Sequence, residues 1–543
     1  MIILQRIRIT KRILSTALAT LIAGSMFAVP ALAEEAYDGY LYDWWNEAIP
    51  SQTGYVPERQ VTGNDLGIGD FKVPLDIFAT DEGDFYVADS EFETNFDDGT
   101  YSKGRIVKID NDMEKATAVF DRVDLSEVGD WLSAQKERFD SGEIDEIEYN
   151  AITAQGFNIP AGVYVTPDDM LYVADSKNRR VIAGYQRKDS QGNDIFVAKY
   201  IYIRPDEKDY DENVAFEPTK VVVDRAKNVY ANVKSITKGA VEFSETGEFN
   251  RYFGANRVKR TAEVLASKVW QFFMTEEQLQ KSKKNVSAEF SNFDIDDDNF
   301  IYTVTEVKSA DIDVLKKVSP KGTNVFESMG ISDTTFGDFY SVRYRDVTYS
   351  SQIIDVDISE NGLINLLDAQ TGRVFVYDQD CLLLYIYGGL GNQKGTFTTP
   401  KALETYGDKS YVLDMEKANI TIFKQTEFGA IVNDAIELYS DGKYTESMEL
   451  WDEVLRRDNN YWFAYVAIGN AYLFLGEYDK AMDYFYMNSR GGYNQAFRNF
   501  RMEYVRNNFS VILGIILAVI IIPIVIKKVI KISKKLKQKK GAA

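Results

Sequence analysis

The segment Leu171-Tyr172-Val173-Ala174-Asp175-Ser176 decides the fold, because it nearly duplicates the earlier segment Phe85-Tyr86-Val87-Ala88-Asp89-Ser90. Weaker copies follow along the chain, each centred on a tyrosine or its substitute. They are Val229-Tyr230-Ala231-Asn232, Ile301-Tyr302-Thr303-Val304, Leu363-Ile364-Asn365-Leu366 and Ser410-Tyr411-Val412-Leu413-Asp414. A short strand and a polar turn precede each copy, and a third strand follows it. Strand, turn and strand recurring in this way indicate a radial array of β-sheets.

The repeats resemble those of the NHL-repeat β-propeller family, most closely from Pro160-Ala161-Gly162-Val163 to Asp175-Ser176-Lys177-Asn178-Arg179-Arg180-Val181. The resemblance covers roughly residues 56–427 and implies one blade per copy, hence a mainly β, six-bladed propeller. The copies are more widely spaced than usual blades, so insertions are expected. Residues 121–155 and 255–288 lack the strand–turn rhythm, and we predict that both insertions are helical.

The ring is predicted to close through a strand from the N-terminal side. The segment from Val61 to Phe71 is similar to the inter-blade segment from Tyr387 to Phe397. The strand before it, about 56–61, should therefore pair with the last blade near residues 420–423. Such closure removes the exposed edges of the sheets.

After residue 427 the hydrophobic period becomes helical. Gly442-Lys443-Tyr444 recurs as Gly476-Glu477-Tyr478, which resembles the 34-residue period of tetratricopeptide (TPR) repeats. We expect TPR-like helices over 428–490 and a connecting helix over 491–508. Two such repeats are fewer than the three usually needed for stability, so the alternative is a packed spacer between propeller and membrane.

Both ends of the chain carry signals for a membrane location. Residues 1–33 have four basic residues, an apolar run and the site Ala31-Leu32-Ala33, which predicts a cleaved signal peptide; a first membrane helix is the alternative. An extension follows over 34–55. Residues 509–526 form an uncharged run long enough to span a bilayer, and eight lysines follow within 527–543. Because positive residues stay in the cytosol, we expect a single-pass protein of the cell membrane with its N-terminal domain outside, at the cell surface or in a periplasm.

The amino-acid composition excludes several common classes of enzyme mechanism. The 543 residues contain no histidine and one cysteine, Cys381, which excludes histidine-based catalysis, histidine-ligated metals and intramolecular disulfides. The formal net charge is −21, and setting aside four positive charges in 1–33 and eight in 527–543 leaves −33 outside the membrane. Such a body repels nucleic acid, so no nucleic-acid partner is expected.

Candidate ligand-binding residues follow from the repeat register. In each blade, the residue two positions after the proline should line the central channel. These residues are Asp76, Gly162, Lys220, Asn292, Ile354 and Ala402. We predict Asp76, Lys220 and Asn292 as the polar groups that could bind an axial ligand. One carboxylate beside a lysine is a poor site for a divalent cation, so no metal, cofactor or catalytic residue is predicted; a register error of one residue would bring in Asp294 or Asp355.

Other side chains receive structural interpretations. Residues 294–299 look like part of a calcium loop but align with the hairpin turn of every other blade, which favours a turn. We predict that Asp89 and Asp175 hold the loop beyond their strand, with a ligand role as the alternative, and that Cys381 is buried. Trp44 and Trp45 should form an apolar plug against the propeller; stacking on sugar rings is the alternative.

The sequence therefore favours a non-enzymatic, membrane-tethered, extracytoplasmic binding or scaffold protein that presents propeller and TPR-like surfaces. The overall plan resembles bacterial NHL-repeat membrane proteins thought to accompany sugar-uptake transporters, which implies a protein partner at the membrane surface and allows a small-molecule or glycan ligand. The alternative is a calcium-dependent gluconolactonase-like hydrolase, a family of six-bladed propellers that hold a central metal.

Overall fold

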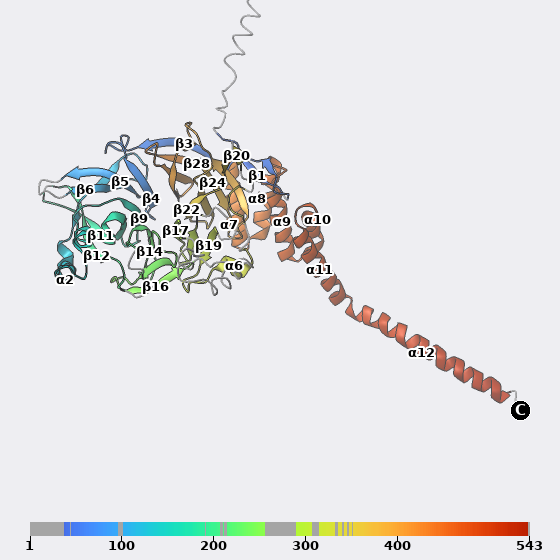
Figure 1. Cartoon of the computed structure of the whole chain (residues 1–543). Helices are drawn as coiled ribbons and strands as arrows, with labels where there is room; N and C mark the ends of the chain where they lie inside the picture. Colours follow the sequence, from blue (N-terminus) through green and yellow to red (C-terminus); the bar gives the residue numbers. More distant parts are fainter. Residues whose placement is uncertain are drawn as a thin grey trace, which may run out of the picture.

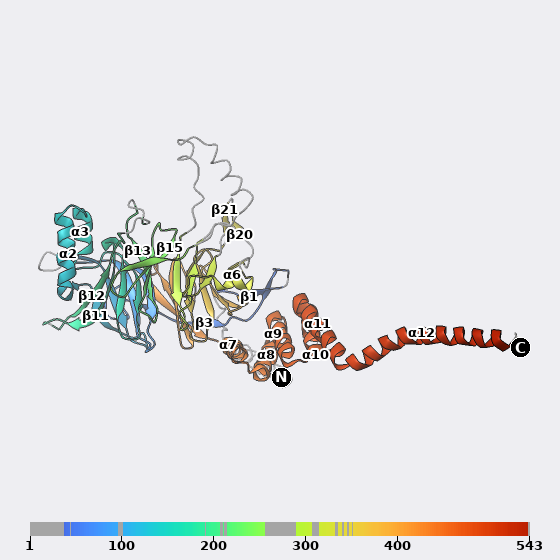
Figure 2. The ribbon, with the colours of Figure 1, turned by 90° about the horizontal axis from the view of Figure 1, so that it is seen from below.

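A computed structural model shows a six-bladed β-propeller followed by a helical segment and one long apolar helix (Figures 1 and 2). The structure describes residues 37–43, 45–95, 101–190, 192–206, 210, 214–255, 289–306, 314–331, 335–338, 342–344, 347–349 and 351–540. The predicted signal peptide over 1–33 and the predicted helical insertion over 255–288 lie outside these residues, except for residue 255.

Each blade is built from antiparallel strands, the first of which lies at the propeller axis, and in blade two a short additional strand pairs in parallel at the outer edge. The first three blades comprise β4 (Val73–Ala79), β5 (Phe85–Asn95), β6 (Tyr101–Ile109) and β7 (Ala116–Phe120); β9 (Pro160–Val165), β10 (Leu171–Asp175), β11 (Arg180–Lys188) and β12 (Asp194–Tyr202), with the short β8 (Val123–Asp124) beside β12; and β13 (Pro218–Val223), β14 (Val229–Val233), β15 (Gly239–Phe243) and β16 (Phe249–Gly254).

The other three blades follow the same order. They comprise β17 (Asn292–Ile295), β18 (Ile301–Val304) and β19 (Leu315–Val318), the three strands described for blade four; β22 (Ile353–Ile358), β23 (Ile364–Asp368), β24 (Arg373–Tyr377) and β25 (Leu383–Gly388); and β26 (Pro400–Tyr406), β27 (Lys409–Asp414), β28 (Asn419–Gln425) and β3 (Tyr55–Thr62). Apolar side chains between neighbouring sheets form the core, as alternation along each strand requires.

The predicted ring closure is confirmed. Strand β3 pairs antiparallel with β28, and Val61 lies opposite Ile420. The sixth blade therefore combines three strands from the C-terminal end of the propeller with one from its N-terminal end. This seam joins the two ends of the ring in one sheet.

Short elements decorate the ring. Helices α2 (Gly129–Asp140) and α3 (Glu146–Ile152) lie within the first insertion, as expected, and α6 (Val325–Met329) follows β19. Two small hairpins are β1 (Tyr40–Tyr42) with β2 (Ala48–Pro50), and β20 (Val342–Tyr344) with β21 (Val347–Tyr349). Trp45, in the turn between β1 and β2, is 75% exposed, so its predicted role as an apolar plug is wrong; a turn tip holds it in solvent. Trp44 lies outside the described residues.

The helical segment packs directly onto the propeller. It comprises α7 (Glu427–Ser440), α8 (Tyr444–Arg457), α9 (Trp462–Leu475), α10 (Tyr478–Asn488) and α11 (Arg490–Asn507). One hydrophobic cluster contains Leu384 and Phe423 of the propeller together with Val432 and Trp451 of the helices. The Tyr385 hydroxyl donates to Oδ1 of Asn433 at 2.8 Å. The first helices and blades five and six therefore share one core.

The last helix, α12 (Phe509–Lys540), extends away from the rest of the chain (Figure 1). Its segment Phe509–Lys534, 26 residues long, is the one helix among the described residues that is long and apolar enough to cross a membrane. It contains Pro523, and its apolar side chains are exposed.

Candidate functional site: the axial pocket

The six inner strands place equivalent residues around the propeller axis. In blade one, Asp76 lies opposite Ala88 after a bulge at Pro74, and the same bulge recurs in β9, β13, β22 and β26. This register defines a first ring of axial residues. Its members are Asp76, Gly162, Lys220, Asn292, Asp355 and Ala402. The three residues predicted as ligand-binding, Asp76, Lys220 and Asn292, thus lie in one ring; whether they bind a ligand stays a prediction.

In blade five the predicted channel residue, Ile354, is wrong by one position. Asp355 is the residue that faces the axis, because Ile353 takes the place of the blade proline and the bulge follows it. Asp355 is 1% exposed and accepts hydrogen bonds from the Leu403 amide at 2.7 Å and from Nδ2 of Asn292 at 2.5 Å. The first ring therefore contains two carboxyl groups and not one.

Lys220 supplies the positive charge of the first ring. Its ammonium lies 2.7 Å from Oδ1 of Asp76, whose other oxygen accepts from the Val163 amide at 2.8 Å. Burial alone would lower the pKa of Lys220, but the charges of Asp76 and Asp355 outweigh it and raise that pKa. The ammonium therefore stays charged and occupies the axis beside both carboxyl groups.

A second ring lies two residues further along the inner strands, and sequence reasoning missed it. Three of its members are acidic: Asp294 on β17, Asp357 on β22 and Glu404 on β26. Each bonds to the inner strand of the next blade, Asp294 to the Ile358 amide at 2.8 Å and Glu404 to the Ala79 amide at 2.9 Å. Asp357 accepts from the Thr405 hydroxyl at 2.7 Å. These bonds fix the orientation of all three carboxyl groups.

Burial raises the pKa values of all three acidic members of the second ring, and neighbouring charges add to this for Asp357 and Glu404. Burial raises the pKa of Asp294 to about 6. Burial and the charge of Asp294 raise the pKa of Asp357 well above its ordinary value, and burial with the charges of Asp357 and Asp294 does the same for Glu404. Like charges at short range oppose one another's ionisation, so the acidic side of the ring holds its protons to higher pH than exposed carboxyl groups do.

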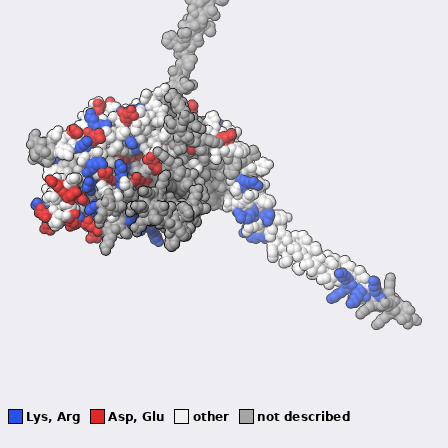
Figure 3. Space-filling view, viewed as in Figure 1, with Lys and Arg blue, Asp and Glu red and all other residues white. Residues whose placement is uncertain are grey.

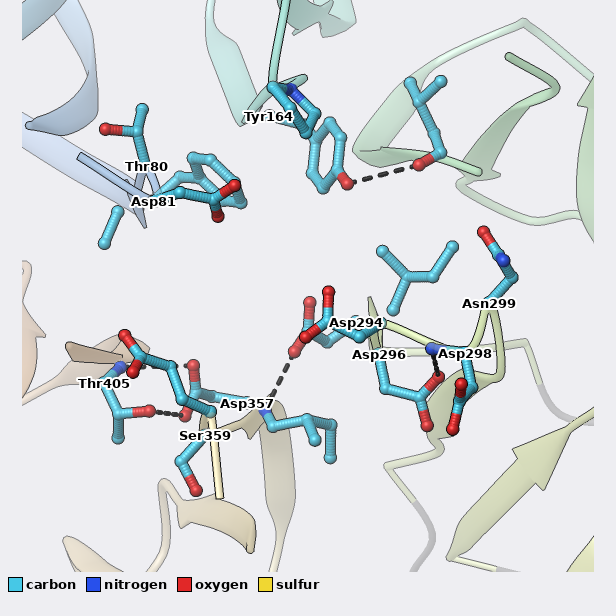
Figure 4. A pocket seen from close by; sticks show the side chains of 18 of the residues that line it. Thr80, Asp81, Tyr164, Asp294, Asp296, Asp298, Asn299, Asp357, Ser359 and Thr405 are labelled. Atoms are coloured by element: carbon cyan, nitrogen blue, oxygen red, sulfur yellow. Dashed lines mark hydrogen bonds between the residues drawn. The ribbon is translucent and has the colours of Figure 1, made fainter. Parts of the chain in front are cut away.

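The other half of the second ring is apolar. Phe78 on β4 and Tyr164 on β9 lie with ring centroids 4.8 Å apart, and Val222 occupies the next position. The Tyr164 hydroxyl donates to the Val223 carbonyl at 3.2 Å. The ring thus has an acidic side and an aromatic side, and Figure 4 shows Asp294 and Tyr164 across the same open space.

All members of the second ring except Val222 line the floor of a pocket of about 860 Å³. Hairpin turns between the first two strands of the blades make its rim, and Asp224 and Asp296 hold two of these turns by accepting backbone bonds. Ten acidic and three basic side chains line the pocket, so it disfavours anions. Ser440, the last residue of α7, also contributes to the wall.

The residues of the predicted turn over 294–299 have two different roles. Asp294 faces the axis, whereas Asp296 accepts bonds from the amides of Asp298 and Phe300 at 3.0 and 2.8 Å, as a structural turn requires. Among the described residues, no group of three or more Asp, Glu or Cys side chains is arranged to hold a metal ion.

The prediction that Cys381 is buried is confirmed, whereas the backbone bonds of Asp89 and Asp175 go to the loop before the inner strand of their blade and not to the loop beyond their own strand. Asp89 accepts bonds from the Lys72 and Val73 amides and pairs with Arg105, while Asp175 accepts from the Asn158 amide. Both carboxylates therefore hold the loop that leads into an inner strand. Cys381 is 4% exposed.

These features define the class of protein: a six-bladed β-propeller with an axial pocket, followed by helices and one helix able to span a membrane. No family model and no curated protein matches the sequence.

The chain has low similarity to several solved structures. Virginiamycin B lyase from Staphylococcus aureus is 9% identical, with 66% of this chain and 97% of that chain covered and a TM-score of 0.33. A streptogramin B lyase is 9% identical over 69% of this chain and 100% of its own, with a TM-score of 0.36. A protein of unknown function from Bacteroides thetaiotaomicron is 12% identical over 69% and 72%, also at 0.36. Similarity at this level carries no information on chemistry.

Proposed function

We propose that this chain is a membrane-anchored, extracytoplasmic binding protein whose NHL-type propeller holds a small polyhydroxylated ligand, such as a sugar, in its axial pocket. The observation that carries the proposal is the divided floor, with Asp294, Asp357 and Glu404 on one side and Phe78 and Tyr164 on the other. A sugar offers an apolar ring face for the aromatic side and hydroxyl groups for the acidic side. Few, well-oriented polar groups beside apolar ones are typical of small-molecule sites.

The raised pKa values support an uncharged ligand. A protonated carboxyl group both donates and accepts hydrogen bonds, as a hydroxyl does, whereas a carboxylate only accepts. Burial raises the pKa of Asp294 to about 6, so the floor holds a mixture of both forms near neutral pH. The acidic lining disfavours phosphorylated sugars, because their charge has the same sign.

The proposed location and partners follow from the ends of the chain. The signal peptide over 1–33 would export the propeller and the TPR-like helices, and α12 would hold them at the membrane with the lysine-rich tail in the cytosol. A protein partner in or on the membrane, with a sugar-uptake transporter as the proposed one, would then meet a ligand-loaded propeller. The proximity of α7 to the pocket, through Ser440, supports a role that combines ligand and partner.

The test is binding to the full chain in lipid nanodiscs. Calorimetry with neutral mono- and oligosaccharides should give binding, and phosphorylated sugars or polyamines should bind more weakly. Phe78→Ala should weaken the affinity for the sugar about tenfold by removing an aromatic contact. Tyr101→Ala, at a 63% exposed ring remote from the pocket lining, is the matched control. Unchanged affinity in a folded Phe78→Ala variant, or preference for polyamines, would overturn the proposal.

A gluconolactonase-like hydrolase is the second candidate. The observation in its favour is the acidic floor, because carboxyl groups with raised pKa values are suited to proton transfer near neutrality. The charged Lys220 beside Asp76 and Asp355 stands against it, since a cation at the axis would be repelled.

A further inference from the structure

Helix α11 presents a row of exposed aromatic rings. Tyr493, Phe497, Phe500 and Tyr504 are spaced by four, three and four residues, which places them on one face. Phe497, Phe500 and Tyr504 are 43%, 42% and 60% exposed. The face packed against α10 borders this row: Ala496 is buried in a cluster with Phe485, and the half-buried Tyr493 packs against the same cluster, which leaves Phe497, Phe500 and Tyr504 as the exposed part of the row.

Positive charge accompanies the aromatic row. The helix contains four arginines and one acidic residue, Glu503, which lies 3.9 Å from Arg506. The Arg501 guanidinium lies 5.6 Å from the ring centroid of Phe497. Figure 3 shows basic side chains gathered beside the uncharged start of α12. This concentration contrasts with the strongly acidic chain to which the helix belongs.

The aromatic row is continuous with the apolar helix. Helix α11 ends at Asn507 and α12 begins at Phe509, with a non-helical backbone at Asn508 between them. Figure 2 shows the two helices meeting at a bend. If α12 crosses a bilayer, the C-terminal end of α11 is separated from the start of the span by one residue and therefore lies at the bilayer surface. The bend between the two helices allows α11 to follow that surface.

We propose that α11 lies in the headgroup layer of the membrane, with its aromatic row immersed and its arginines at the lipid phosphates. Tyrosine is enriched at membrane interfaces, arginine extends its charge towards headgroups, and a helix with aromatic and basic faces lies in the plane of the interface. The partner is therefore the bilayer surface next to the span, not a second copy of this chain. This contact would fix how the propeller is tilted above the membrane.

The test measures the depth of labels on two sides of α11 in the full chain. Cys381 is buried and burial raises its pKa to about 12, so cysteines introduced at Phe500 and Met502 can be labelled selectively. Met502 is 64% exposed and lies about 200° around the helix from Phe500, which makes it the matched control. Each labelled protein is placed in nanodiscs holding one copy, with anionic lipids brominated in their acyl chains.

We expect the lipids to quench a fluorophore at Phe500→Cys strongly and one at Met502→Cys weakly. Arg498→Gln combined with Arg501→Gln should reduce the quenching at position 500, and so should zwitterionic lipid. Equal quenching at both positions would overturn the proposal, because α11 would then stand in water or continue the span. Quenching at position 500 in crowded vesicles that vanishes in single-copy nanodiscs would also overturn it, in favour of a second copy.

Discussion

The ammonium nitrogen of Lys220 lies 2.7 Å from Oδ1 of Asp76, although the two residues belong to blades three and one. The intervening blade contributes Gly162, where an added Cβ would lie 2.8 Å from the Cα of Lys220. A side chain at this position would crowd the strand that carries the lysine. The ion pair therefore links two blades that are not neighbours. It can form because Gly162, in the blade between them, has no side chain to occupy the space beside Lys220.

Breaking this ion pair should destabilise the propeller. Both side chains are buried, so Lys220→Met leaves the Asp76 charge without its partner at a cost of about 3–5 kcal/mol in the free energy of unfolding. The double variant Lys220→Met with Asp76→Asn should recover part of this loss. Urea unfolding of both variants measures the effect; a single variant as stable as the wild type would show that the pair does not stabilise the ring.

The second ring should make stability depend on pH. Burial raises the pKa of Asp294 from 3.8 to about 6, so the folded state binds more protons than the unfolded state between these values. The free energy of unfolding should then fall as the pH rises from about 4 to about 7, by about 2–3 kcal/mol for this group.

Asp294→Asn keeps an oxygen for the Ile358 amide and removes the titration. Melting curves across the pH range should show a smaller loss in this variant than in the wild type. Asp298→Asn, at an exposed turn position, is the control and should behave as the wild type does. Parallel pH profiles for Asp294→Asn and the wild type would contradict the prediction.

The junction between helices and ring should be sensitive to one methyl group. A Cβ at Gly429 in α7 would lie 2.3 Å from the carbonyl oxygen of Gly54, so backbone must shift. Gly429→Ala should lower the free energy of unfolding by about 1–3 kcal/mol. Gly491→Ala in α11, where the new methyl group would have no neighbour within 4 Å, should leave stability unchanged or raise it. Equal effects of the two substitutions would show that this contact is loose.

Topology can be read from protease protection. Protease added to intact spheroplasts should digest residues 34–508 and leave a small C-terminal fragment, because α12 and the lysines that follow would be shielded by the membrane and the cytosol. An epitope tag after Ala543 would identify the fragment. Protection of the large domain would mean the opposite orientation.

Assays should detect no metal-dependent lactone hydrolysis. A catalytic divalent cation needs several oxygen ligands and would have to displace the ammonium of Lys220 from the axis. Activity tests with calcium, zinc or manganese should show no turnover. A chelator should not shift the melting temperature. Turnover that requires a metal and is abolished by Asp76→Ala would favour the hydrolase instead.

Much of the ring was predictable, because its markers are local. The tyrosine strands, the loop-holding role of the aspartates at their ends and the closing strand β3 follow from repeated residues, although the loop that the aspartates hold precedes the inner strand. The first ring was misplaced in blade five because two markers are missing there: Ile353 replaces the proline, and Asn365, opposite Asp357, replaces the tyrosine. Counting from Ile364 then shifts the register by one residue.

The second ring needed geometry that the repeat alone does not supply. Alternation along a strand places residues two apart on the same side, so Asp294 follows from Asn292 and Glu404 from Ala402. That signal was present in the sequence. The effect of Asp294 on the pKa values of Asp357 and Glu404 could not be predicted, because it depends on how three separate strands meet around the axis.

The packing of α7 on the seam determines where a force on the helices would enter the ring. A force on α12 would reach blades five and six through packed helices, with Gly429 against Gly54, and not through a slack linker. The load would then enter the propeller at the sheet where β3 and β28 hold its two ends together. The hydrogen bonds of this single strand pair would set the tension at which the ring opens.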